Sequence, residues 1–375
     1  MKKGWQTKTL GEVCHVYQPE TISQKQMKAG GVRVYGANGQ IGWHNEFNHE
    51  DSQLILGCRG SCGTVHITEP RSWINGNAMV VQPKSGVMYK SFLAYALKGG
   101  IELSDAITGA AQPQITRKSL MPLAIYFPES LPEQQRIVAL LDEAFAGLAT
   151  AQAHAERNLR NARALFESHL NAVFTQRGEG WVETRLEDVC GLQNGFAFKS
   201  ATFRTSGAPI LRISNIQDGR IDAGDRLVFF DPKDYRENLD RYRIVEGDLL
   251  IAMSGATTGK LGFNTGSTVY YLNQRVGKFE PNGRLNVRFL YHFLSTKVEE
   301  NLRISSGAAQ PNLSTEQIKG FVLPLPAIND QERIVEAIDG LSDETQRLTR
   351  LYERKLAALA ALKQSLLHQA FSGAL

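Results

Sequence analysis

Two copies of one unit follow each other along this chain. The segment Gly109 to Pro113 (GAAQP) returns as Gly307 to Pro311, and Gln134 to Val138 (QQRIV) returns as Gln331 to Val335 (QERIV). The second pair of segments opens two long helical patterns, which keep the same spacing to their ends. Such a duplication predicts two similar structures, each made of a globular part and a long helix.

Each copy begins with a tryptophan segment, Trp5 to Cys14 in the first and Trp181 to Cys190 in the second. From the tryptophan to the glycine motif the first copy has 104 residues and the second 126, so the added length lies in the second globular part. We therefore expect a first globular domain over residues 1–130, a central helix over 131–177, a second globular domain over 178–328 and a C-terminal helix over 329–375.

The composition is that of a folded protein with two domains of ordinary size. The chain has 375 residues, of which 42% are hydrophobic and 21% charged. No apolar run approaches the roughly 20 residues that span a bilayer, and Met1 to Lys3 leads into a polar segment. We expect a cytoplasmic protein.

Four cysteines in this length do not form a disulfide framework. Cys14 and Cys190 occupy equivalent places in the two copies and are interpreted as small buried residues. Cys58 and Cys62, together with His66, offer three zinc ligands, but the second copy has no replacement ligands there. A plain structural role is the preferred interpretation, with zinc as the alternative.

The net charge of +4 is unevenly distributed. Residues 1–131 carry 13 basic and 9 acidic side chains, and residues 180–328 carry 18 and 16. The helical blocks, 132–179 and 329–375, each have one acidic residue in excess. This pattern is consistent with globular parts that contact a polyanion and helices that have a different role.

The globular parts contain short β-like runs that are interrupted by glycine, followed by one helix-like segment each. The predicted strands are Val32–Tyr35, Gln53–Leu56, Ala78–Gln82, Pro209–Ile213 and Asp248–Ala252, and the predicted helices are Tyr89–Leu97 and Val287–Leu294. We expect α+β domains with many loops, where recognition residues tend to lie.

The long helices are expected to begin at capping boxes, Ser130 with Glu133 and Asn329 with Glu332. Their apolar residues recur in steps of three and four, and both contain two successive steps of four at equivalent positions, which include Ala155. This shared irregularity indicates that the two helices pack on each other. Antiparallel packing predicts a pseudo-two-fold arrangement with one globular part at each end of the helix pair.

The pattern resembles the specificity subunit of type I restriction-modification systems over essentially the whole chain. The resemblance depends on Leu10–Val13, Leu186–Val189, Tyr35–Gly42, Gly247–Lys260, the two glycine motifs and the two helix starts. In that family the globular parts are target recognition domains, each reading one half of a split, asymmetric DNA site. The helices set the spacing between the halves and bind methyltransferase subunits.

The resemblance also implies the partners and cofactors. Two methyltransferase (modification) subunits would dock on this chain and bring S-adenosylmethionine, and restriction (motor and nuclease) subunits with ATP and Mg2+ would join the assembly on double-stranded DNA. The chain itself would bind no cofactor or metal, catalyse nothing and contact no membrane.

The alternative is a self-contained DNA methyltransferase or nuclease. A phosphate-binding loop needs four residues between its glycines and Ser or Thr after the lysine, whereas Gly255 to Lys260 has three and is followed by Leu261. Gly57 to Gly63 is too loose for a methyltransferase cofactor motif, and Asp231-Pro232-Lys233 lacks the second proline and the aromatic residue of a catalytic tetrad. No convincing metal-binding carboxylate cluster is present for a nuclease. A third class is a coiled-coil assembly protein without a DNA role.

Arg, Asn and Gln are the side chains that bind guanine and adenine edges through two hydrogen bonds. For each candidate, an equal alternative is that it caps a turn or lies in solvent. Gln112-Pro113 and Gln310-Pro311 are interpreted as structural links between globular part and helix. The candidate DNA-binding residues of the first domain are Tyr35, Asn38, Arg59, Ser61, Asn75, Asn77 and Gln114, and those of the second are Arg212, Ser214, Asn215, Ser254, Thr257, Lys260, Asn273, Gln274 and Arg275.

Overall fold

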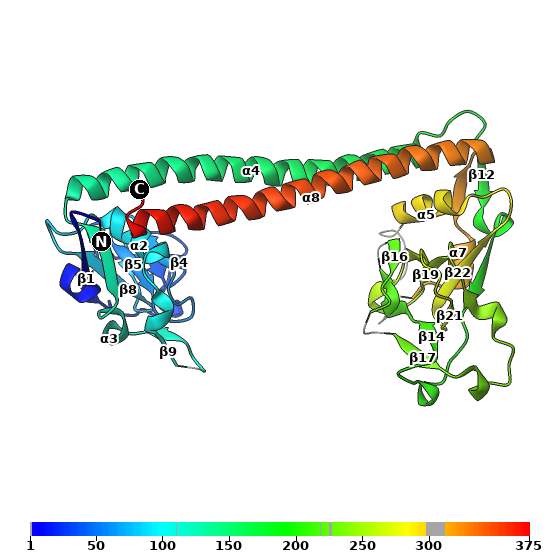
Figure 1. Cartoon of the computed structure of the whole chain (residues 1–375), viewed down its shortest axis with the longest axis horizontal. Coiled ribbons are helices and arrows are strands. Elements are labelled where there is room, and N and C mark those ends of the chain that lie inside the picture. Colours follow the sequence, from blue (N-terminus) through cyan, green and yellow to red (C-terminus); the bar gives the residue numbers. More distant parts are fainter. Residues whose placement is uncertain (1, 110, 218, 225–226, 298–311) are drawn as a thin grey trace. The chain divides into compact units, whose positions relative to one another are not determined.

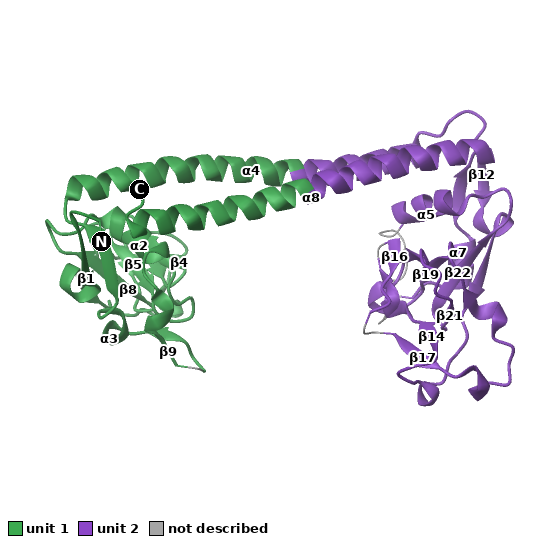
Figure 2. Cartoon of the chain, in the orientation of Figure 1, with its two compact units in different colours: residues 1–158, 351–375 green, residues 159–350 purple. Residues whose placement is uncertain are grey.

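The computed structural model describes residues 2–109, 111–217, 219–224, 227–297 and 312–375 (Figure 1). The chain divides into two compact units, residues 1–158 with 351–375 and residues 159–350 (Figure 2). Each unit therefore contains one globular part and a segment of each long helix.

The globular part of unit 1 contains a four-stranded antiparallel sheet in the order β2-β8-β5-β6, and a three-stranded sheet in the order β4-β3-β7. In these sheets the strands are β2 (Cys14–Tyr17), β3 (Val32–Gly36), β4 (Gly39–His44), β5 (Leu54–Gly57), β6 (Val65–Ile67), β7 (Trp73–Ile74) and β8 (Ala78–Pro83). Two further strand pairs are β1 (Trp5–Thr9) with β11 (Ala124–Pro128) and β9 (Ile107–Thr108) with β10 (Gln114–Ile115). The helices are α1 (Leu10–Val13), α2 (Lys90–Gly99) and α3 (Arg117–Leu120), and the 3-10 turns are η1 (Gln24–Gln26) and η2 (Leu103–Ala106).

The globular part of unit 2 has a six-stranded sheet, β13-β22-β19-β20-β16-β15, a four-stranded sheet, β17-β14-β21-β18, and the pair β12-β23. The strands are β12 (Val182–Arg185), β13 (Cys190–Asn194), β14 (Ala208–Leu211), β15 (Ile216–Gln217), β16 (Gly219–Ile221), β17 (Val228–Phe230), β18 (Arg243–Ile244), β19 (Leu249–Ala252), β20 (Leu261–Phe263), β21 (Tyr270–Leu272), β22 (Val276–Pro281) and β23 (Val322–Leu325). Its α-helices are α5 (Val287–Thr296) and α7 (Thr315–Lys319), with 3-10 turns η3 (Leu186–Asp188), η4 (Ser200–Thr202), η5 (Ile213–Asn215), η6 (Pro232–Asp234), η7 (Asp240–Tyr242) and η8 (Gly255–Thr257).

The two globular parts repeat one topology. The order β2-β8-β5-β6 corresponds to β13-β22-β19-β20, and the parallel pair β3-β7 corresponds to β14-β21. The central strands β5 and β19 are buried at all four positions, as their continuous apolar runs predict. In unit 2 the strands β15, β16 and β18 are additions to this plan, whereas β17 pairs antiparallel with β14 as β4 pairs with β3. A separate apolar core surrounds Phe198, Phe230 and Leu272.

The long helices are α4 (Leu131–Thr175) and α8 (Ile328–Ser372). In unit 1 the start of α4 packs against the end of α8, because Ile137 and Leu141 share a core with Leu367 and Phe371. Further along, Asn158 Nδ2 donates to the Tyr352 hydroxyl at 3.2 Å, beside the predicted irregularity. The segments therefore run antiparallel within this unit.

In unit 2 the end of α4 packs against the start of α8, where Leu170 and Phe174 share a core with Val335 and Ile338. The helix segments are thus antiparallel here too. The predicted fold class, α+β globular parts with long antiparallel helices in an internal repeat, is confirmed. In the described part of the chain, no helix has an apolar stretch that would carry it across a membrane.

Buried glutamines join each globular part to its long helix. The Gln134 side chain is fully buried; its Oε1 accepts from Tyr89 N at 2.7 Å, and its Nε2 donates to Val87 O and Pro128 O at 3.1 and 2.9 Å. Gln331 repeats this arrangement in unit 2, with Asn286 N, Arg284 O and Pro326 O as its partners.

Two predictions about these junctions are corrected. Gln112-Pro113 does not link the globular part to the helix: it lies in the exposed connection between β9 and β10, and α3 and β11 follow before α4 begins. Gln310-Pro311 lies outside the described residues. Asn329 does not cap α8, because that helix begins one residue earlier, at Ile328.

Candidate nucleic-acid interface

In unit 1 the candidate residues gather around the turn that follows β5. Ile115 N donates to Cys58 O at 3.0 Å, which brings β10 beside the end of β5 and pairs Gln114 with Arg59. Cys58 N in turn donates to Asn77 O at 3.0 Å. The backbone thus collects three polar side chains from three separate segments.

The turn itself is closed by Thr64. Its hydroxyl donates to Ala37 O and to Ser61 O, the latter at 2.9 Å. These bonds bring Asn38, which is exposed, next to Ser61, which is half-buried. Arg59 and Asn77 are exposed and Gln114 is half-buried, so these five candidates lie on one accessible region of unit 1.

Two unit 1 candidates have a structural position instead. Asn75 is 3% exposed; its Oδ1 accepts from Ile22 N at 3.0 Å and its Nδ2 donates to Ile22 O at 3.2 Å. Tyr35 is 7% exposed and lies in the core of β3. Both side chains support the backbone beneath the accessible candidates.

In unit 2 the corresponding region forms around the end of β19. Met253 N donates to Arg275 O at 2.8 Å, and Ser254 pairs with Asn312. Gln274 N donates to Phe196 O at 2.8 Å, which holds the chain on the other side of this region. Gln274 and Arg275 are exposed and Ser254 is half-buried.

The other unit 2 candidates make hydrogen bonds in the neighbouring turns, where all but Asn215 are half-buried. Asn215 is fully buried, and its Oδ1 accepts from Arg212 N at 3.0 Å. The Thr257 hydroxyl donates to Ile213 O at 2.9 Å, and Lys260 Nζ donates to Gln217 Oε1 at 3.3 Å. Ser214 O accepts from the side chain of Gln217, and Asn273 Oδ1 accepts from Gln274 N.

Asn312 is the polar residue that the sequence reasoning missed. It is exposed and lies opposite Ser254, and its Oδ1 accepts from Arg275 Nη1 at 3.5 Å. The signal that could have found it is the duplication: Gln114 follows Pro113 in the first glycine motif, and Asn312 follows Pro311 in the second.

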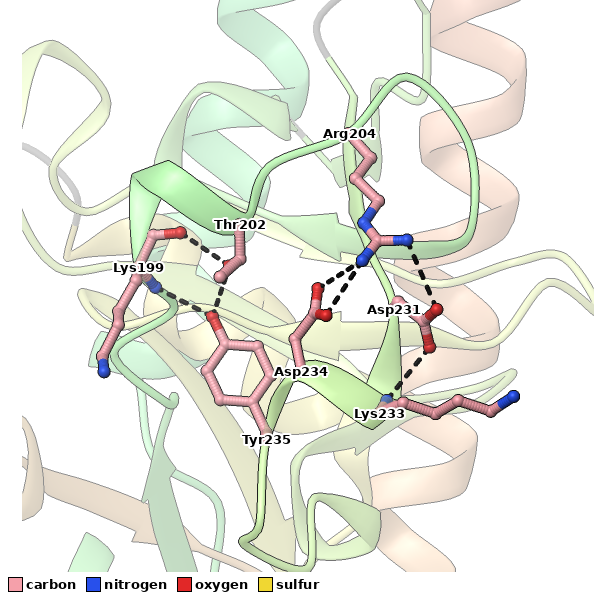
Figure 3. A network of polar contacts seen from close by, with 7 residues as sticks. All are labelled: Lys199, Thr202, Arg204, Asp231, Lys233, Asp234 and Tyr235. Atoms are coloured by element: carbon pink, nitrogen blue, oxygen red, sulfur yellow. Dashed lines mark hydrogen bonds and ion pairs between the residues drawn. The ribbon is translucent and has the colours of Figure 1, made fainter.

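A polar network stabilises the longer loops of unit 2 (Figure 3). Arg204 Nη2 donates to both carboxylate oxygens of Asp234, at 2.9 and 2.8 Å, and Arg204 Nη1 donates to Asp231 at 3.3 Å. The Lys199 and Lys233 ammonium groups point away from this network (Figure 3). The arginine is therefore engaged with carboxylates, whereas the two exposed lysines are directed outward.

Three of the four cysteines, Cys14, Cys58 and Cys190, are buried. Burial raises the pKa of Cys14 and of Cys190 to about 12. The Cys58 thiol, whose pKa burial also raises, donates to Asn77 O at 3.1 Å, and the Cys62 thiol donates to Pro113 O at 3.0 Å. These hydrogen bonds support the structural interpretation of both residues. Among the residues that the structure describes, no group of three His, Cys, Asp or Glu side chains could hold a metal ion.

The protein thus contains two copies of one α+β domain. Each copy has an accessible polar cluster at the end of its central strand. The family model described as the type I restriction modification DNA specificity domain matches residues 2–156 and 178–355, which is both copies. The chain belongs to the type I restriction-modification DNA specificity family.

Individual relatives agree with this assignment. The chain is 22% identical to the type I restriction enzyme MjaVIII specificity subunit of Methanocaldococcus jannaschii over 79% of its own length and 73% of that protein. It is 27% identical to the EcoBI specificity subunit of Escherichia coli over 57% of its length, and the match spans less than half, 43%, of that relative.

Solved structures share the fold over the whole chain. A chain from a study of complex assembly and conformational transition in the type I R-M system superimposes with a TM-score of 0.79, covering 99% of this chain and 98% of that one at 18% identity. The HsdS subunit from Thermoanaerobacter tengcongensis superimposes with a TM-score of 0.63, covering 100% and 98%, also at 18% identity.

Proposed function

We propose that this chain is the DNA-reading specificity subunit of a type I restriction-modification complex, and that each unit reads one half of a bipartite, asymmetric site. The observation that carries this is the match of the DNA specificity domain to both copies, combined with two accessible clusters at equivalent places that carry different side chains. Different side chains at equivalent places read different bases.

The proposed partners are double-stranded DNA, two methyltransferase subunits and restriction subunits, in the cytoplasm. The solved structure with the TM-score of 0.79 comes from a study of complex assembly in the type I R-M system. This likeness supports the proposal that this chain also binds partner subunits. S-adenosylmethionine, ATP and Mg2+ are assigned to those partners.

We assign the accessible members of the two clusters to DNA contact and the buried members to support. The side chains assigned to face or border the duplex are, in unit 1, Asn38, Arg59, Ser61, Asn77 and Gln114. In unit 2 they are Arg212, Ser214, Ser254, Thr257, Lys260, Asn273, Gln274, Arg275 and Asn312. Tyr35, Asn75 and Asn215 hold the backbone that presents them.

The test separates a reading subunit from an independent enzyme. The purified chain is incubated with DNA and labelled S-adenosylmethionine, and separately with DNA and Mg2+, with and without a co-expressed type I methyltransferase subunit. We expect methyl transfer only with the partner and no cutting by the chain alone. Methylation or cleavage by the isolated chain would refute the proposal.

A further inference from the structure

A small set of backbone hydrogen bonds presents three side chains in unit 1. Cys58 accepts from Ile115 N and donates to Asn77 O. Because neighbouring residues of an extended chain point to opposite faces, the buried Cys58 and Ile115 turn Arg59 and Gln114 outward. Arg59 and Gln114 are bridge partners, so their Cβ atoms lie roughly 4.5 to 5.5 Å apart on the same face.

The same bonds recur in unit 2. Met253 accepts from Leu313 N at 2.8 Å and donates to Arg275 O at 2.8 Å. Met253 is 6% exposed and Leu313 is 1% exposed, and their neighbours Ser254 and Asn312 are bridge partners on the accessible face. Residues 59, 77 and 114 of unit 1 therefore correspond to residues 254, 275 and 312 of unit 2.

The backbone at Arg275 supports a functional role for this set. Arg275 has a φ of +72°, in the left-handed region that is unfavourable for residues other than glycine. The bond from Met253 N to Arg275 O holds this conformation. Such strained positions persist where the surrounding structure imposes them, and they gather at binding sites.

The contact between Arg275 and Asn312 places the two side chains next to each other. Arg275 Nη1 reaches Asn312 Oδ1 at 3.5 Å. A guanidinium and a carboxamide that lie side by side can address adjacent base pairs, which are stacked roughly 3.4 Å apart.

We propose that these two equivalent triads are the specificity-determining positions: Arg59, Asn77 and Gln114 for one half-site, and Ser254, Arg275 and Asn312 for the other. The inference rests on the proposed function and adds the residues that discriminate bases, including Asn312. Each triad contains one arginine, which suits guanine, and at least one carboxamide, which suits adenine. The arginine occupies a different position in each triad, so the two half-sites have different sequences.

Preferred sequences are selected from a randomised duplex library with the full chain in the presence of its methyltransferase partner. The chain is used as wild type and as single variants. Asn312→Ala should lower the discrimination at one base pair of one half-site by roughly 5- to 150-fold and leave the other half-site unchanged. Gln114→Ala should do the same in the other half-site. Each substitution removes one accessible side chain and leaves the backbone hydrogen bonds of the triad in place.

The matched control is Asn194→Ala. Asn194 lines the same groove of about 380 Å3 as Arg275 and Asn312, but its amide already donates to the Thr315 hydroxyl at 2.9 Å. We expect it to keep both half-site preferences. Thermal unfolding of each variant identifies any that fail to fold, and retention of the unaffected half-site provides a second check.

Three outcomes are distinguishable. Separate relaxation of one half-site by each variant supports the triads. Uniform weakening on all sequences, with a smaller salt dependence, would show phosphate contacts and overturn the triads while the proposed function stands. A wild-type chain without bipartite preference, in the presence of its methyltransferase partner, would overturn the proposed function itself.

Discussion

Replacement of Gln134 by alanine should destabilise unit 1 strongly. The side chain is fully buried and makes three hydrogen bonds, so the change leaves Tyr89 N–H, Val87 O and Pro128 O without this partner. An unsatisfied buried group costs about 1 to 3 kcal/mol. Partial relaxation and water entry reduce the sum, and we expect a loss of about 3 to 5 kcal/mol in the free energy of unfolding.

Urea unfolding measures the loss, and hydrogen exchange locates it. Exchange at the Tyr89 amide should accelerate, while the Asn286 amide, which Gln331 binds in unit 2, should keep its protection. The control is Gln135→Ala, at the exposed neighbouring position, with an expected change within about 0.5 kcal/mol. An unchanged unfolding midpoint for Gln134→Ala, with the Tyr89 amide still protected, would show that the buried hydrogen bonds of Gln134 do not stabilise unit 1.

Three further predictions follow from other contacts. Burial lowers the pKa of His292 despite the opposing effect of Asp339, so the folded state disfavours the charged form. The free energy of unfolding should therefore fall as pH drops below about 6.5. His292→Tyr should remove this part of the pH dependence in urea titrations at several pH values. Arg204→Ala removes two partly exposed ion pairs, with Asp231 and Asp234, and should cost about 1 kcal/mol or less, a difference that shrinks at 1 M salt in thermal unfolding. Four residues inserted after Ala155, matched by four near Tyr352, should lengthen α4 by about 6 Å and the DNA spacer by one or two base pairs, as selection from a spacer library would measure; an unchanged spacer would contradict a spacing role of the helices.

The duplication made most of the fold predictable. The predicted strand Ala78–Gln82 is β8 (Ala78–Pro83), and the predicted helix Val287–Leu294 is α5 (Val287–Thr296). Apolar periodicity determines which residues enter the core, so it predicts these elements. Exact ends differ because backbone pairing and local hydrogen bonds decide them.

The site was less predictable, because Asn and Gln serve turns and ligands equally well. Asn75 and Asn215 are buried turn supports, whereas Asn77 is exposed two residues after Asn75. The long-range pairing of Ser254 with Asn312 places the latter at the surface cluster, and the sequence signal for it is its equivalence to Gln114 in the first copy. Contacts over such sequence separations leave no local pattern to read.

The most direct test of the central claim, that each unit reads one half-site, is an exchange of the second globular part. Residues 181–306 are replaced by the equivalent residues of another family member, and the methylated sites of cells that carry the complete system are sequenced. We predict that one half-site changes to that of the donor while the other is retained. A change in both half-sites, or in neither, would contradict it.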